Sequence, residues 1–207
     1  MDFSFTEEQT LLEDSVSKYI QNDYDFDSRQ KLVRSEQGFS SENWSQFAEL
    51  GWFGVCFTEA EGGFGGGAIE LMLMAEQFGK GLLVEPYLAT VVLAGGAIKH
   101  GGSEDQKAKY LPGIIDGSVQ AALAYAEPQG RFNLADLTTT AQRDADGYVL
   151  KGYKAVVLNG PAADLLVVTA RTSGEQRDTS GVSVFVVDAN AEGVSRRDYP
   201  TVDGLRA

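Results

Sequence analysis

Residues 101–130 constrain the fold more than any other stretch, because the spacing of apolar residues changes there from helical to strand-like. Ser103 and Gln106 stand three residues apart, in the pattern by which each side chain satisfies a free backbone N–H at the start of a helix. Pro112 predicts the end of that helix. Residues 119–126 form a short, mostly apolar run, which is typical of a buried strand.

Helical patterns dominate the sequence before this change, and strand patterns dominate after it. Thr6 and Gln9 repeat the capping pattern before an amphipathic helix, which we expect to end near Asn22. Further helices are expected over residues 25–35, 41–50, 69–78 and 87–99. Strands are expected over residues 138–143, 148–150, 154–158, 165–171, 182–188 and 194–199, with a hairpin turn at residues 144–147. This order predicts an α+β fold: an all-α helical bundle, then an antiparallel β-barrel or sandwich-like domain.

A glycine-rich loop at residues 58–67 offers two interpretations. Gly63, Gly65 and Ala68 match the dinucleotide-binding pattern G-x-G-x-x-G/A, and Glu85 lies near the distance expected for a ribose contact. That pattern belongs directly after a strand inside a βαβ unit, whereas polar residues intervene here and no parallel strand follows promptly. The sequence therefore favours a turn that uses glycine's freedom to adopt positive φ angles.

Composition narrows the class of protein and its compartment. The formal net charge is −13, from 17 basic and 30 acidic side chains, which disfavours nucleic acid and anionic membranes as partners. Cys56 is the only cysteine and His100 the only histidine, so neither an internal disulfide nor a multi-cysteine metal site is expected. The N-terminus lacks the pattern of a secretory signal, and the most apolar run, residues 87–98, is too short to span a bilayer. We expect a cytoplasmic protein.

Four stretches resemble the acyl-CoA dehydrogenase family. They are FTEEQTLLEDSVSKYI from residue 5, TEAEGGFGGG from residue 58, GSEDQKAKYLPGIIDGSVQAALAYAEPQG from residue 102 and DGYVLKGYKAVVLNGPAADLLVVTAR from residue 146. Their order and spacing also match the family. Within it, the chain resembles a bacterial branch, the small subunits of pimeloyl-CoA dehydrogenases, in which two different dehydrogenase-like chains pair.

The resemblance implies a domain plan, a cofactor and partners. It implies a helical N-terminal domain over residues 1–117 and an incomplete middle β-domain over residues 118–207, truncated before a C-terminal helical bundle. It further implies FAD as cofactor, an acyl-CoA substrate, electron-transfer flavoprotein or a similar acceptor, and a homo- or hetero-oligomer with another acyl-CoA dehydrogenase chain. The family's catalytic glutamate would lie beyond Ala207, so the chain alone is expected to be inactive, with no catalytic residue of its own.

The resemblance also assigns site residues by position. Backbone groups of five residues are expected to contact the flavin: Tyr125, Ala126, Val156, Val157 and Leu158. Phe132 is expected near the substrate, because it lies where the family has Gly-Ser-Asp close to the pyrophosphate and the CoA. Ala126 replaces the family's threonine ahead of an intact Glu127 and Pro128, Val156 replaces a tryptophan, and Leu158 replaces a second threonine.

These departures leave two hypotheses about function. The first is an FAD-dependent acyl-CoA dehydrogenase subunit that acts on the CoA thioester of a carboxylic or dicarboxylic acid and holds FAD mainly through backbone groups. The second is a flavin-poor structural partner that completes the site of a companion subunit.

Overall fold

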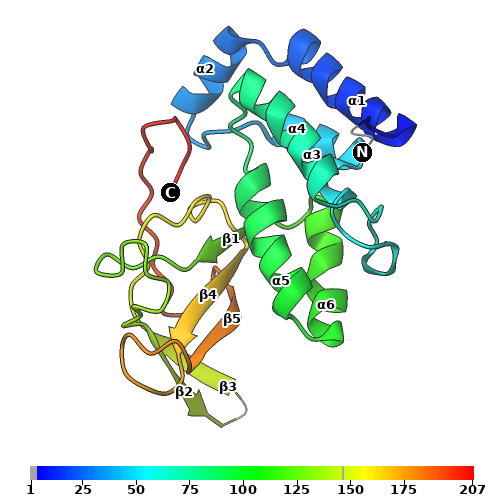
Figure 1. Cartoon of the computed structure of the whole chain (residues 1–207). Helices are drawn as coiled ribbons and strands as arrows, with labels where there is room; N and C mark the ends of the chain where they lie inside the picture. Colours follow the sequence, from blue (N-terminus) through cyan, green and yellow to red (C-terminus); the bar gives the residue numbers. More distant parts are fainter. Residues whose placement is uncertain (1–3, 146) are drawn as a thin grey trace. The chain divides into compact units, whose positions relative to one another are not determined.

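The computed structural model of the chain describes residues 4–145 and 147–207 (Figure 1). Residues 1–3 and Asp146, which belong to the N-terminal segment and the hairpin turn discussed above, lie outside this range. The fold groups the chain into two compact units that alternate along the sequence. The first comprises Met1–Glu85, Ala108–Ser118 and Asp203–Leu205, and the second comprises Pro86–Lys107, Val119–Val202 and Arg206–Ala207. The domain boundary near residue 117 stays a prediction.

The first unit is helical. Its elements are α1 (Glu7–Asp23), α2 (Phe26–Arg34), α3 (Ser41–Glu49), α4 (Ala68–Gly81), residues 108–115 of α6 (Glu104–Ile115) and the short 3-10 turns η1 (Trp52–Gly54) and η2 (Glu59–Glu61). Helix α1 packs along α4 (Figure 1). The capping pattern before α1 is confirmed, because the N–H of Gln9 donates to Thr6 Oγ1 at 3.1 Å and the N–H of Thr6 donates to Gln9 Oε1 at 3.0 Å.

Aromatic side chains form the core of this unit. Tyr19 of α1, Phe47 of α3 and Phe78 of α4 surround Trp52, with ring centroids 4.9–5.7 Å from it for all three. Trp52 and Phe47 are almost completely buried. Stacked and edge-to-face aromatic packing of this kind adds to the stabilisation from burial, so the helices are held by a dense, specific core.

The glycine-rich loop is a tightly packed turn and not a dinucleotide-binding loop. It follows the 3-10 turn η1 instead of a strand, and it contains the second 3-10 turn, η2. A Cβ at Gly63 would clash with the carbonyl oxygens of Gly54 and Phe57, so the glycine is needed for close backbone packing. Glu85 is buried and accepts hydrogen bonds from Tyr24 Oη at 2.7 Å and Asn43 Nδ2 at 2.9 Å. The ribose-contact interpretation of Glu85 is therefore not supported, because its carboxylate ties helices together.

The second unit combines two helical segments with a sheet. Its elements are η3 (Leu88–Gly95, a π-helix), α5 (Gly96–Gly101), β1 (Ala121–Ala124), β2 (Thr140–Asp144), β3 (Gly147–Lys151), β4 (Leu165–Arg171) and β5 (Val182–Asp188). The apolar segment η3 packs on β1, where the buried Thr90 hydroxyl donates to the carbonyl of Ala121 at 3.0 Å.

Among the helices that the structure describes, none is long and apolar enough to cross a membrane.

The sheet is mixed, whereas the sequence predicted an antiparallel one. The strand order is β1-β4-β2-β3. Strand β5 lies outside this order and also pairs with β4 (Figure 1). The pairs β2/β3 and β4/β5 are antiparallel, but β1 and β2 run parallel to β4. The parallel pairing is possible because a long connection, which includes the β2–β3 hairpin, returns the chain to the starting end of β1. The α+β class itself is confirmed.

Three local predictions differ from the structure. Residues 154–158 and 194–199 form no regular strand. Val156 within the first of these has a φ of +52°, which is incompatible with extended backbone. Helix α6 does not end at Pro112 as predicted but continues to Ile115. The proline cannot donate the hydrogen bond of its position and its ring crowds the preceding turn, yet only the last turn of the helix follows it, and its carbonyl accepts the N–H of Asp116 at 2.9 Å.

Candidate functional site

Two segments of the second unit lie side by side and contain five of the six predicted site residues. The first follows β1 and carries Tyr125 and Ala126; the second precedes β4 and carries Val156, Val157 and Leu158. The N–H of Ala155 donates to the carbonyl of Ala126 at 2.9 Å, which joins the two backbones directly. The structure therefore brings together residues that lie about 30 positions apart in the sequence.

A buried ion pair ties the same two segments together through their side chains. Lys154 Nζ lies 2.7 Å from Glu127 Oε1, and the side chains are 9% and 0% exposed. Glu127 also accepts hydrogen bonds from the N–H and hydroxyl of Thr138 at 2.7 and 2.6 Å, the N–H of Thr139 at 3.1 Å and Gln129 Nε2 at 2.8 Å. A buried carboxylate is tolerated when it is paired and hydrogen-bonded in this way.

The surroundings shift the pKa values of both partners. Burial raises the pKa of Glu127, but the hydrogen bonds from Lys154, Thr138 and Thr139 outweigh it and hold that pKa well below its usual range. Burial lowers the pKa of Lys154, and the hydrogen bond and charge of Glu127 oppose this effect. Glu127 is therefore a carboxylate at neutral pH, and its charge is committed to holding Lys154 and the two threonines.

Thr169 on β4 adds a third link between the segments. Its hydroxyl accepts a hydrogen bond from Lys154 Nζ at 3.1 Å and donates a long one to the carbonyl of Tyr125 at 3.5 Å. The central strand of the sheet thus anchors both segments. Sequence reasoning did not find Thr138 and Thr139, which donate to Glu127, or Thr169, which bonds Lys154, because nothing in the sequence distinguishes them from ordinary strand or loop threonines.

Val156 has a strained backbone conformation at the centre of this site. Its φ of +52° lies in the left-handed region, where a β-branched residue is a true outlier. Such a conformation costs about 1–3 kcal/mol and persists only where the surroundings enforce it. Its side chain is 55% exposed, so burial of that side chain does not explain the strain. Strain of this kind gathers at functional sites, which marks these residues independently of any sequence pattern.

The backbone donors of the two segments suit a flavin ring. Within residues 4–145 and 147–207, the N–H groups of Ala126, Val157 and Leu158 donate to no protein acceptor. The pyrimidine edge of a flavin carries carbonyl oxygens and ring nitrogens that accept hydrogen bonds, and such bonds are how a protein orients the ring and tunes its chemistry. Because these donors belong to the backbone, the loss of side-chain hydroxyls at residues 126 and 158 leaves them in place.

Comparison with known proteins identifies the family. Residues 6–118 match the family model described as acyl-CoA dehydrogenase, N-terminal domain, and residues 122–207 match the model described as acyl-CoA dehydrogenase, middle domain. The chain belongs to the acyl-CoA dehydrogenase family. The family resemblance seen in the sequence is thereby confirmed.

Individual relatives agree with this family assignment. The acyl-CoA dehydrogenase FadE12 of Mycobacterium tuberculosis (strain ATCC 25618 / H37Rv) is 33% identical over 199 residues, which cover 93% of this chain and 50% of that protein. The ChsE4–ChsE5 complex of the same species superimposes with a TM-score of 0.86 at 28% identity, over 100% of this chain and 54% of that one. The FAD complex of PigA gives a TM-score of 0.86 at 28% identity, over 97% of this chain and 53% of that one. The chain spans about half the length of the relatives it matches.

Phe132 is the one predicted site residue that is not joined to the others. Phe132 lies near the middle of the loop between β1 and β2, and its side chain is fully exposed. In the described part of the chain, no hydrogen bond or ring contact links it to the other five residues. The loop itself is firmly held. The buried Asp136 accepts hydrogen bonds from Gln176 Nε2 at 2.6 Å and Arg177 Nε at 2.7 Å, and Arg171 donates to the carbonyl of Ala135 at 2.7 Å.

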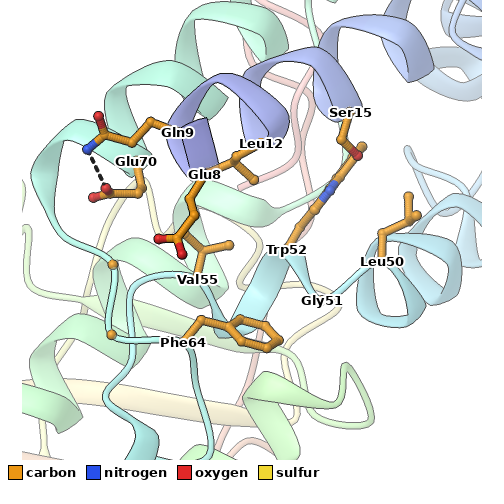
Figure 2. Close-up of a pocket in the computed structure, with 12 residues that line it drawn as sticks. Glu8, Gln9, Leu12, Ser15, Leu50, Gly51, Trp52, Val55, Phe64 and Glu70 are labelled. Carbon is orange, nitrogen blue, oxygen red and sulfur yellow. Dashed lines mark hydrogen bonds between the residues drawn. The ribbon is translucent and has the colours of Figure 1, made fainter. Parts of the chain in front are cut away.

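A cavity of about 350 Å³ lies in the first unit (Figure 2). Its walls come from α1, the end of α3, the glycine-rich loop and the start of α4. Figure 2 shows Gln9 and Glu70 on one side, where Gln9 Nε2 donates to Glu70 Oε1 at 2.7 Å, and the ring of Phe64 on another. None of the predicted site residues lines this cavity, so it is not the candidate site.

Proposed function

We propose that the protein is an FAD-dependent acyl-CoA dehydrogenase subunit, which acts in the α,β-dehydrogenation of a carboxylic or dicarboxylic acyl-CoA thioester. One observation supports it most strongly. The segments that carry residues 125–127 and 154–158 are tied together by the Glu127–Lys154 pair and the Ala155–Ala126 hydrogen bond, and they leave adjacent backbone donors free. The family assignment and the FAD complex of a structural relative agree with this use of the site.

In this proposal the chain's own residues bind and orient the cofactor. The N–H groups of Ala126, Val157 and Leu158 would hold the ring through hydrogen bonds, and the exposed side chain of Val156 would contribute to the same surface. FAD, when bound, supplies the capacity to accept a hydride from the β-carbon. Phe132 would lie on the substrate side, presented by the anchored loop between β1 and β2.

None of the candidate site residues supplies a catalytic base. Glu127 is the only carboxylate among residues 125–128 and 154–158, and it is buried and committed to Lys154. A base must instead be free to accept a proton within reach of the substrate. We therefore expect the 207-residue chain to bind FAD without turning over an acyl-CoA by itself.

The remaining expectations extend this proposal. The partners would be an acyl-CoA, an electron-transfer flavoprotein or similar acceptor, and a second acyl-CoA dehydrogenase chain in a homo- or hetero-oligomer. We place the protein in the cytoplasm, with a helical domain over residues 1–117 and a β-domain over residues 118–207. No nucleic-acid or membrane partner is part of the proposal.

The second hypothesis, a flavin-poor structural partner of another dehydrogenase chain, rests on a specific observation. The side chains at residues 126, 156 and 158 are aliphatic, so none offers the ring a hydrogen bond or an aromatic face. The visible absorption spectrum of the purified chain, recorded with and without added FAD, separates the two functions. One flavin per chain supports the enzyme subunit. A chain that is colourless as purified, and again colourless after incubation with FAD and removal of the unbound flavin by gel filtration, would instead support the partner role.

A further inference from the structure

The ring-facing turn, residues 156–160, is held at two points by a distant segment. Val156 and Asn159 both have positive φ angles, +52° and +59°. Asparagine adopts this conformation readily, whereas a β-branched valine does not. The turn therefore needs external support, and it needs it most at Val156.

Both of these residues donate their backbone N–H to residues 199–207. The N–H of Val156 donates to Tyr199 Oη at 3.1 Å, and the N–H of Asn159 donates to the carbonyl of Arg206 at 2.9 Å. The two ends of this segment are themselves paired, because Tyr199 and Ala207 exchange backbone hydrogen bonds of 3.0 and 3.1 Å. The donors of the strained turn are thus fixed by a closed loop of chain about 40 residues away.

We infer that Tyr199 is a positioning residue for FAD, which acts by holding Val156 in its left-handed conformation. The inference rests on the proposed function for the identity of the ligand. The free N–H groups of Val157 and Leu158 follow Val156 directly, so rotation of Val156 into the extended region redirects both of them. Tyr199 itself lies outside the set of ring-facing residues, and its phenol acts through the backbone of the turn.

Replacing Tyr199 with phenylalanine removes the acceptor and keeps the ring. In Tyr199→Phe, amide hydrogen exchange at Val156 should become several-fold faster, and FAD should bind about 2- to 10-fold more weakly, the effect of one ordinary hydrogen bond. Tyr153→Phe is the matched control, because Tyr153 is 67% exposed and its hydroxyl has no hydrogen-bond partner in the described part of the chain. It should change neither quantity.

A second variant separates positioning from a general structural role. Glycine adopts positive φ without strain, so in the Val156→Gly background the Tyr199→Phe change should cost clearly less FAD affinity than in the wild-type chain. An equal loss in both backgrounds would overturn the inference, as would unchanged amide exchange at Val156 in Tyr199→Phe. If the chain binds no FAD, the proposed function fails, and the exchange rates, measured without FAD, still decide whether Tyr199 holds the turn.

Discussion

Replacing Lys154 with methionine tests how strongly the ion pair holds the site together. The side chain of Glu127 is fully buried, so this change leaves a buried carboxylate without its cation. Breaking such a pair costs about 3–5 kcal/mol. Thr138, Thr139 and Gln129 still donate to Glu127, so we expect the lower end, a loss of about 3 kcal/mol in the free energy of unfolding.

Urea denaturation at pH 7, followed by far-UV circular dichroism, measures this loss. The control is Lys80→Met, which breaks a pair of similar length with Glu76, 2.9 Å, in which both side chains are more than half exposed. That change should cost no more than about 0.5 kcal/mol. Equal losses for the two variants would refute the idea that the buried pair joins the two segments.

The pH dependence of unfolding gives an independent check of the same pair. The pKa of Glu127 is lower in the folded chain than its ordinary value of 4.5. Its stabilising contribution is therefore complete above about pH 5 and is lost as the pH falls below 4.5, since the unfolded state then binds the proton first. In Lys154→Met the folded pKa rises, so the contribution of Glu127 to acid-induced loss of stability should shrink. An unchanged acid branch would contradict the assignment.

Two further predictions concern neighbouring residues. Ala126→Thr restores the hydroxyl of the family pattern and should tighten FAD binding by about 1 kcal/mol in a fluorescence titration; an unchanged affinity would mean that the ring does not approach residue 126. Arg171→Met should lower the free energy of unfolding by more than about 3 kcal/mol, because the buried guanidinium donates to five backbone carbonyls. These belong to Ala135, Ser173, Gln176, Asp178 and Ser180. Arg143 is exposed, so Arg143→Met should lower the free energy of unfolding only slightly. Similar losses in the two variants would contradict the structural role of Arg171.

Local rules were enough to predict most of the helical half of the chain, although not the continuation of α6 through Pro112. The capping residues Thr6 and Ser103 begin α1 and α6, and the apolar face of α1 contributes Val16, Tyr19 and Ile20 to the core. Each of these signals depends on residues three or four positions apart, which a sequence displays directly. The class of fold and the family followed from such patterns together with the motifs.

The details of the site depend on contacts between distant residues, which local patterns do not contain. Residues 154–158 form a short, mostly apolar run typical of a strand, yet the bonds of Ala155 to Ala126, Lys154 to Glu127 and Val156 to Tyr199 impose an irregular path. The parallel pairing of β1 with β4 likewise depends on the course of a long connection. Positions 125, 126 and 156–158 were identified through the family motif, whereas Tyr199 and the threonines around Glu127 had no signal in the sequence.

The most direct test of the central claim is an NMR titration of the 15N-labelled chain with FAD. The claim is that the adjacent segments carrying Ala126 and residues 156–158 form a cofactor-binding surface. The amide signals of Ala126, Val157 and Leu158 should shift together and saturate at one FAD per chain, while amides of the helical core, such as that of Phe47, stay unchanged. Saturable binding that shifts other amides and leaves these three in place would contradict the account.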